Sequence, residues 1–118
     1  SVSHIHKLKD AEILAKKSIL KENIWKSGDP ALFRQRYRPS LAYRLALVAE
    51  GKFDAMIALG RSWEWDICAG HLLVSEAGGT ATDSLGDEIV YNSTIGSSKG
   101  IVAGGPTIHK SVIDELDV

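Results

Sequence analysis

One carboxylate, Asp66, stands where the sequence predicts the start of an almost wholly apolar helix. The backbone N–H groups in the first turn of a helix are partly positive and favour an anion, so Asp66 would fit there as a helix cap. A carboxylate held at the mouth of a buried helix also suits a hard metal ion, because Mg²⁺ prefers carboxylate and water oxygens. The spacing alone leaves both interpretations open.

The residues after Asp66 predict a helix that is packed on more than one side. Small and apolar residues recur at helical spacing along one stripe, and the flanks of the stripe are apolar too: Ile67, Gly70, Leu73, Val74 and Ala77 on the stripe, Cys68, Ala69 and Leu72 on the flanks. Gly78 and Gly79 are predicted to end the helix, since glycine adopts the left-handed conformation that closes a helix C-terminus. Glu76 is predicted to be structural, because it lies about three turns from Asp66.

The stretch 63–79 resembles the second signature of the inositol monophosphatase superfamily. It has the Trp-Asp pair of that signature (Trp65 and Asp66), two small residues, an apolar run and a final Glu-Ala-Gly-Gly. The resemblance implies that Asp66 ligates an active-site Mg²⁺ near the leaving-group oxygen and orients a substrate hydroxyl. Trp65 would brace Asp66 by packing. Three glycines are expected to support this architecture: Gly70, Gly78 and Gly79.

The block 40–60 resembles the stretch that precedes this signature in the superfamily. It has a hydroxyl residue, an amphipathic helix ending in Val-Ala-x-Gly, an Asp-Ala pair and a strand. Ser40 is predicted either to cap the helix or to donate to a substrate hydroxyl or phosphate. Arg61 lies in the loop before the signature, where it would either face the leaving group or stay solvated. Ser40 and Arg61 are therefore candidate substrate-binding residues, together with Asp66.

Alternation at 33–38 predicts a strand with its arginines on one face and its aromatic residues on the other: Arg34, Arg36 and Arg38 against Phe33 and Tyr37. Three arginines on one face suit phosphate, because each guanidinium offers forked donors to phosphate oxygens. They equally suit a solvated or subunit-facing edge, where charge prevents unwanted strand pairing. Arg38 is the one expected to bind substrate, because it adjoins the start of the next helix.

The first ten residues predict a short strand or a loose arm. In a strand, His4 and His6 would share one face, as a pair of metal ligands does. No third His and no Cys lies nearby in the sequence. The favoured interpretation is therefore two half-buried or solvated histidines.

The resemblance covers nearly the whole chain and is strongest over 39–79, but it is to the carboxy-terminal half of the superfamily fold. Relatives carry further metal ligands, a Glu and an Asp-Pro-x-Asp-Gly-Thr motif, in an amino-terminal half. The only Asp-Pro here is Asp29-Pro30, and no Asp-Gly-Thr follows it. Phosphate monoester hydrolysis by this route needs two or more cations, so the segment is expected to be inactive by itself. The amino-terminal half of the same enzyme is thus an expected partner.

The resemblance implies a substrate such as inositol monophosphate or a related small phosphate ester. Inositol-selective members bind ring hydroxyls through a Glu that matches Ala58 here, and Pro39 replaces a Gly before the hydroxyl residue. The loop before Asp66 also has one residue more, which resembles the 3′(2′),5′-bisphosphate nucleotidase branch. Arg38 and Arg61 would suit such a doubly phosphorylated ligand. A non-catalytic interaction domain, with Asp66 as a cap, is the alternative of a different class.

Strands and helices are expected to alternate along the chain. Strands are predicted at 12–15, 33–38, 53–59, 80–83, 88–91 and 100–103, and helices at 18–25, 40–50, 66–77 and 107–116. This order favours a single α/β domain over residues 1–118, a layered sheet with flanking helices. The resemblance implies the same architecture, namely the carboxy-terminal half of an αβαβα fold.

Composition narrows the class of protein. The 118 residues are 44% hydrophobic and 25% charged with a net charge of −1, so no global field attracts nucleic acid or an anionic membrane. No apolar run reaches about 18 residues and no signal-peptide layout is present. The single cysteine, Cys68, forms no internal disulfide and suits a reducing cytoplasm. The resemblance implies a homodimer.

Overall fold

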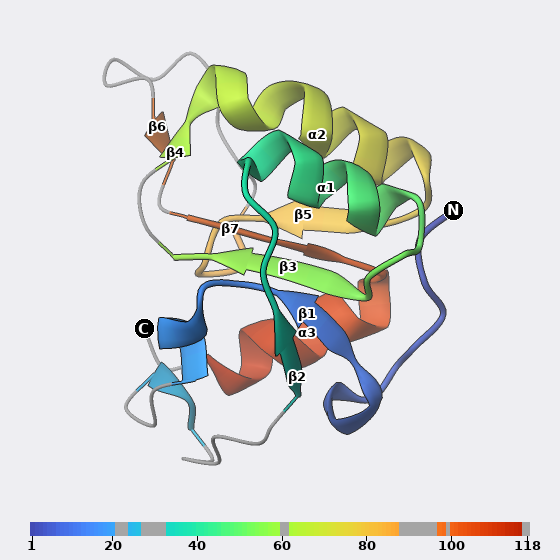
Figure 1. Cartoon of the computed structure of the whole chain (residues 1–118), viewed down its shortest axis with the longest axis vertical. Helices are drawn as coiled ribbons and strands as arrows, with labels where there is room; N and C mark the ends of the chain where they lie inside the picture. The colour runs from blue at the N-terminus through green and yellow to red at the C-terminus, as the bar shows by residue number, and fades with distance from the viewer. Residues whose placement is uncertain (21–23, 27–32, 60–61, 88–96, 99, 117–118) are drawn as a thin grey trace.

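Figure 1 shows the computed structural model, which describes residues 1–20, 24–26, 33–59, 62–87, 97–98 and 100–116, with the backbone alone at 62–69 and 97–98. Its strands are β1 (Glu12–Leu14), β2 (Arg34–Arg36), β3 (Ala55–Ala58), β4 (Ser62–Trp63), β5 (Thr80–Thr82), β6 (Ser97–Ser98) and β7 (Ile101–Gly104). Its α-helices are α1 (Leu41–Ala49), α2 (Glu64–Glu76) and α3 (Pro106–Glu115), and 3₁₀ turns occur at η1 (Leu8–Asp10) and η2 (Lys17–Leu20).

Among the described strands, five form one sheet in the order β2-β1-β3-β7-β5. β1 runs parallel to β2 and to β3, whereas β7 runs antiparallel to both β3 and β5. β2, β1, β3 and β5 therefore share one direction, and β7 runs against them. The structure confirms the predicted class, a layered α/β sheet with flanking helices.

Two helices connect parallel strands. α1 joins β2 to β3, and α2 joins β3 to β5. Both lie on one face of the sheet, and α3 covers the other face (Figure 1). A helix in such a crossover runs back against its strands, so α1 and α2 point the same way and begin at the same edge of the sheet. We call this edge, where β2 and β3 end, the carboxyl edge.

Alternation along the central strands divides the core into two layers. The layer on the α3 side includes Ile13, Ile57, Val102, Ile108 and Val112. The layer beneath α1 and α2 includes Leu14, Met56, Ala103, Leu45, Val48 and Val74. Each central strand thus sends consecutive side chains to opposite faces, as strand geometry requires. The sheet is buried on both sides, which is typical of parallel sheets.

α1 and α2 pack closely because a glycine lies between them. A Cβ atom at Gly70 would lie 2.5 Å from Leu45 Cδ1 and 2.7 Å from Leu45 Cβ, closer than real side chains approach. Val74, one turn further along α2, is fully buried in the same layer. Gly70 is therefore the residue that lets the two helices touch.

The outer face of α1 and α2 is open. Leu72 and Leu73 are 62% and 50% exposed, and Tyr43 on α1 is 50% exposed. α2 packs on the sheet and on α1, so it is covered on more than one side as expected, while Leu72 and Leu73 remain exposed. None of the helices in the described ranges is long and apolar enough to cross a membrane.

The first residues form neither the strand nor the loose arm that the sequence predicts. Val2 is buried, and its N–H donates to Ala77 O at 3.1 Å. Ser3 Oγ donates to Asp54 Oδ1 at 2.5 Å, while Asp54 Oδ2 accepts from Glu12 N at 2.7 Å. Asp54 thus ties this segment to β1. Individual hydrogen bonds and the buried Val2 side chain, rather than strand pairing, hold it in place.

The α-helix predicted at 18–25 is not found in the described residues of that range, which are 18–20 and 24–25. Residues 18–20 belong to the 3₁₀ turn η2, and Ile24 also has a 3₁₀ conformation. Trp25 instead makes an isolated bridge with Leu116, and its Nε1 donates to Ile19 O at 2.5 Å. Because the backbone of Trp25 pairs with Leu116, Trp25 cannot also continue a helix begun at Ser18.

Two strands also differ from expectation. The strand predicted at 33–38 is limited to β2. Phe33 and Tyr37, which are predicted to share one face of a longer strand, lie outside it, and Phe33 is buried whereas Tyr37 is 45% exposed. The sequence does not predict the short antiparallel pair β4–β6, since two residues make no periodic pattern. The strand predicted at 88–91 lies outside the described residues, as does Asp29-Pro30.

Gly70→Val is expected to lower the free energy of unfolding by about 1–3 kcal/mol, because a branched side chain must displace the buried Leu45. Chemical denaturation followed by circular dichroism would measure the change in the protein that contains this segment. Ser75→Val, at an exposed position of the same helix, controls for placing a β-branched residue in α2. Equal losses in the two variants would contradict the close packing.

A buried histidine joins α3 to β5. His109 Nε2 lies 2.7 Å from Thr82 Oγ1, which itself donates to Asp83 O at 2.9 Å, so Thr82 accepts from the Nε2–H group. Burial lowers the pKa of His109 below its ordinary value of 6.5. The folded structure therefore favours the neutral imidazole.

Stability is expected to fall as the pH drops below 6.5, because the unfolded chain then takes up a proton that buried His109 resists. The contribution is complete above the unfolded pKa and is lost as the pH falls toward the lower folded pKa. His109→Gln keeps a donor for Thr82 without titrating, so it should flatten the dependence of the unfolding free energy on pH. His4→Gln, at an exposed position, is the control for the substitution itself. A His109→Gln profile identical to that of the wild type would refute this assignment.

Candidate active site

The first turns of α1 and α2 lie side by side at the carboxyl edge. Leu45 of α1 packs on Gly70 of α2. Leu41 lies about one helical turn before Leu45, and Asp66 lies about one turn before Gly70, so the two helices are also neighbours at Leu41 and Asp66. Ser40 precedes Leu41, so Ser40 and Asp66 come from neighbouring helix N-termini. In open α/β sheets, ligands bind outside the carboxyl ends of the strands, and helix N-termini offer N–H groups to anions. The backbone at this edge therefore suits an anionic ligand.

Ser40 caps α1 in an unusual backbone conformation. Its Oγ accepts a hydrogen bond from Tyr43 N at 3.4 Å, and its carbonyl accepts from Arg44 N at 3.1 Å. Its φ is 71°, the one positive value outside glycine among the described residues. Such a conformation costs about 1–3 kcal/mol and is found mostly at functional sites. The helix-cap prediction is confirmed, and the substrate contact stays a prediction.

Asp66 is the third residue of α2, which begins at Glu64. It therefore lies among the N–H groups of the first turn, and it is not the capping residue before the helix. The side chains of Trp65 and Asp66 lie outside the described part of the structure, and Arg61 lies wholly outside it. Metal binding by Asp66, bracing by Trp65 and substrate contact by Arg61 stay predictions.

Both arginines of β2 contact residues in or beside β1. Arg34 Nη2 donates to Asp10 O at 3.0 Å, and Arg36 Nε lies 3.3 Å from Glu12 Oε2. Both arginines are exposed on an edge strand, where an ion pair contributes about 0–1 kcal/mol. Their placement fits the interpretation of a charged edge that discourages strand pairing.

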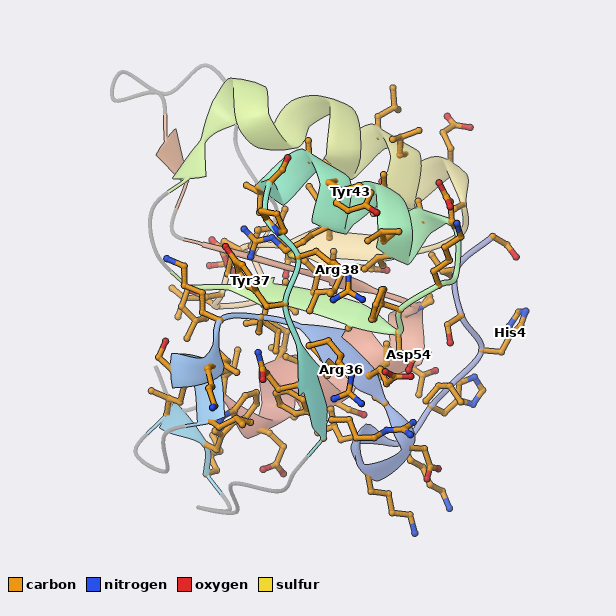
Figure 2. The ribbon with its side chains drawn as sticks, in the orientation of Figure 1. His4, Arg36, Tyr37, Arg38, Tyr43 and Asp54 are labelled. Atoms are coloured by element: carbon orange, nitrogen blue, oxygen red, sulfur yellow. The ribbon has the colours of Figure 1, made fainter. Side chains whose placement is uncertain are left out.

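Arg38 is turned away from the carboxyl edge. Its guanidinium carbon lies 5.3 Å from the centre of the Phe53 ring, a cation–π contact. Phe53 precedes β3, whereas α2 begins after β3 ends, so this contact directs Arg38 toward the amino end of β3 (Figure 2). The structure thus brings the backbones of Ser40 and Asp66 to one edge without bringing Arg38 there. Substrate contact by Arg38 stays a prediction.

Gly78 and Gly79 end α2 at the opposite edge of the sheet, as predicted. Gly78 has a φ of 88°, and Gly79 N donates to Val74 O at 2.8 Å. A Cβ atom at Gly79 would lie 2.8 Å from Val2 Cγ1. Gly79 therefore allows the close approach of α2 and the first residues of the chain, while Gly78 supplies the positive φ at the helix end.

A buried arginine in α1 is a feature that the sequence prediction misses. The side chain of Arg44 is 8% exposed, its Nε donates to Ser40 O at 3.4 Å, and its guanidinium carbon lies 5.4 Å from the centre of the Tyr37 ring. A signal exists in the sequence, because Arg44 follows Leu41 by three residues and precedes Val48 by four. That spacing places a charged residue on the buried stripe of the helix, where it needs a partner inside the fold.

The described residues do not form a complete metal site. Within this part of the chain, no three His, Cys, Asp or Glu side chains stand close enough to hold a metal ion. His4 and His6 are exposed, in agreement with the interpretation as solvated histidines. Mg²⁺ requires several oxygen ligands and usually takes one or two carboxylates together with substrate phosphate and water. The donor set does not fit a self-contained Mg²⁺ site, so such an ion would need ligands from elsewhere.

Comparison with known proteins gives a consistent result. The model described as the inositol monophosphatase family matches residues 2–117. The chain is 40% identical over 76 residues to an inositol-1-monophosphatase of Bacillus subtilis (strain 168), a match that covers 64% of this chain and 27% of that protein. It is 30% identical over 115 residues to a bifunctional NADP phosphatase/NAD kinase of Methanococcus maripaludis, covering 96% of this chain and 20% of that protein.

The fold is also that of a solved relative. Inositol monophosphatase II of Staphylococcus aureus MSSA476 superposes with a TM-score of 0.79 at 22% identity, covering 97% of this chain and 42% of that one. The chain thus spans less than half the length of each of these proteins. The family match takes in both stretches, 40–60 and 63–79, on which the resemblance was based. The chain belongs to the inositol monophosphatase family.

Proposed function

We propose that the protein containing this chain is a metal-dependent phosphomonoesterase that hydrolyses inositol monophosphate or a related small phosphate ester. The family and the named relatives are phosphatases, which supports this class of reaction. The observation that carries the proposal is the juxtaposition of Ser40 and Asp66 on neighbouring helix N-termini at the carboxyl edge. N–H groups from two helices and a carboxylate suit a phosphate ester whose charge is shared with metal ions.

Each predicted residue has a role in this proposal. Asp66 would be one of the residues that hold Mg²⁺ and would orient a substrate hydroxyl, while Trp65 would brace Asp66. Ser40 donates to a substrate hydroxyl or phosphate. Arg61 and Arg38 supply positive charge, and Arg38 must leave its aromatic partner to do so. Mg²⁺, when bound, would stabilise negative charge on the phosphate and on the leaving oxygen.

An amino-terminal half of the same enzyme completes the site in this proposal. The described residues do not form a complete metal site, and the chain spans less than half the length of its relatives. The exposed Tyr43, Leu72 and Leu73 give α1 and α2 an apolar outer face that a further layer would cover. The 118-residue segment alone is then inactive, and the complete enzyme acts as a cytoplasmic homodimer.

A second candidate substrate class is an adenosine nucleotide with an additional phosphate on its ribose. The Methanococcus relative that matches 96% of this chain is named as an NADP phosphatase, and NADP carries such a phosphate. Pro39 and Ala58 also depart from the inositol-selective pattern, and the length of the loop before Asp66 resembles the 3′(2′),5′-bisphosphate nucleotidase branch. Phosphate release from inositol 1-phosphate, adenosine 3′,5′-bisphosphate and NADP, measured side by side, would separate these substrates.

A non-catalytic interaction domain is the alternative of a different class. The lack of an Asp-Pro-x-Asp-Gly-Thr motif in this sequence favours it. Phosphate release from any of these esters by the protein that contains this segment would rule it out.

Asp66→Asn is expected to lower kcat by about a hundredfold or more when the protein that contains this segment is assayed with Mg²⁺. The reason is that a neutral amide is a poorer ligand for a hard cation than a carboxylate. Release of phosphate from inositol 1-phosphate over a range of Mg²⁺ concentrations measures both kcat and the Mg²⁺ requirement. Asp87→Asn, at an exposed position after β5, is the matched control. Unchanged turnover in Asp66→Asn would remove the metal role of Asp66.

A further inference from the structure

Two cation–π contacts hold the turn between β2 and α1. The guanidinium carbon of Arg44 lies 5.4 Å from the centre of the Tyr37 ring, and that of Arg38 lies 5.3 Å from the centre of the Phe53 ring. Figure 2 shows Tyr37 and Arg38 pointing to opposite sides of the chain. Tyr37 is thereby fixed to α1, and Arg38 is fixed to the segment before β3. The turn that leads to Ser40 is held from two directions.

Arg44 differs from Arg38 because it is buried. Burying a guanidinium group costs free energy that an apolar side chain on the same helix stripe would not. Its hydrogen bond to Ser40 O, at 3.4 Å, and its contact with an aromatic face offset part of this cost. The carbonyl that Arg44 holds belongs to the residue with the unusual φ of 71°. The buried charge and the strained backbone therefore meet at a single peptide.

We propose that Arg44 is a positioning residue, which together with Tyr37 holds Ser40 in its left-handed conformation and so fixes the Ser40 hydroxyl at the carboxyl edge. This inference rests on the proposed function, in which Ser40 contacts the substrate. The backbone N–H of residue 44 still donates to the Ser40 carbonyl at 3.1 Å when the side chain is replaced. Loss of the Nε contact and of the Tyr37 contact weakens the hold, and Ser40 then shifts toward the negative φ that L-residues prefer. Its carbonyl and hydroxyl then change direction together. Arg44 thereby affects substrate binding without touching the substrate.

Hydrogen exchange at the Tyr43 amide tests this hold without any assay of activity, because that amide donates to Ser40 Oγ at 3.4 Å. In the protein that contains this segment, Arg44→Met should speed exchange at Tyr43 by about tenfold relative to amides in α3. Arg44→Lys keeps a cation and a donor, so it should restore part of the protection. It also serves if Arg44→Met fails to fold. Arg34→Met, at an exposed arginine of β2, is the matched control and should leave Tyr43 unchanged.

Steady-state kinetics then test the effect on substrate binding. Arg44→Met should raise KM for inositol 1-phosphate by about tenfold while kcat falls by less than about threefold, because the substrate contact is displaced rather than removed from the chemistry. In a Ser40→Ala background, the same substitution should no longer change KM, since the group that Arg44 positions is gone. Arg44→Lys should recover part of the loss.

Each outcome decides one step of the proposal. Unchanged exchange at Tyr43 would overturn the hold, and faster exchange with an unchanged KM would overturn its role in substrate binding. If the changes in KM caused by Arg44→Met and by Ser40→Ala add fully in the double variant, Arg44 acts on a group other than Ser40, and the proposal is overturned as well. A wild-type protein that releases no phosphate would refute the proposed function, while exchange at Tyr43 would still decide whether Arg44 holds the turn.

Discussion

The close contact of α1 and α2 at Gly70 is the interaction on which the candidate site depends. Leu45 fills the space that a side chain at Gly70 would take, and this contact sets how far α1 and α2 are shifted along each other. Both helices belong to crossovers between parallel strands, so this level also brings their first turns to the ends of β2 and β3. Ser40 and Asp66 share an edge as a result of packing deep in the core, a full helical turn away from either residue.

The sequence predicts the longer elements well because two independent signals agree in each. Helical periodicity marks α1, α2 and α3, and end signals such as Gly78 and Pro106 mark where two of them stop or start. The three-residue strands β1 and β5 are predicted too, but the segment around Trp25 and the pair β4–β6 are not, since their partners are distant in the chain. Trp25 is tied to Leu116 in place of a helix, and the pairing of β4 with β6 leaves no periodic pattern to read. Tertiary contacts decide these segments.

The candidate site is predictable in its framework and less so in its details. Ser40 is recognisable as a cap from its residue type and its place before an amphipathic helix, and the structure bears this out. Arg44 escapes prediction because its partners, the Ser40 carbonyl and the Tyr37 ring, meet it only through the conformation of the turn. The nearly continuous apolar surface of α2 also has a physical explanation. One part of it packs on the sheet and α1, and Leu72 and Leu73 remain available for a covering layer.

The place of β7 in the sheet has a consequence for how the protein is made. β7 lies between β3 and β5, although it follows both of them in the chain. A nascent chain that has already emerged from the ribosome through β5 still lacks the strand that joins β5 to β3. Pairings between distant segments of this kind form late and leave strand edges unpaired while they wait, a state that favours aggregation. Assembly of the sheet is thus coupled to the arrival of its last strand, Ile101–Gly104, near the end of synthesis of this segment.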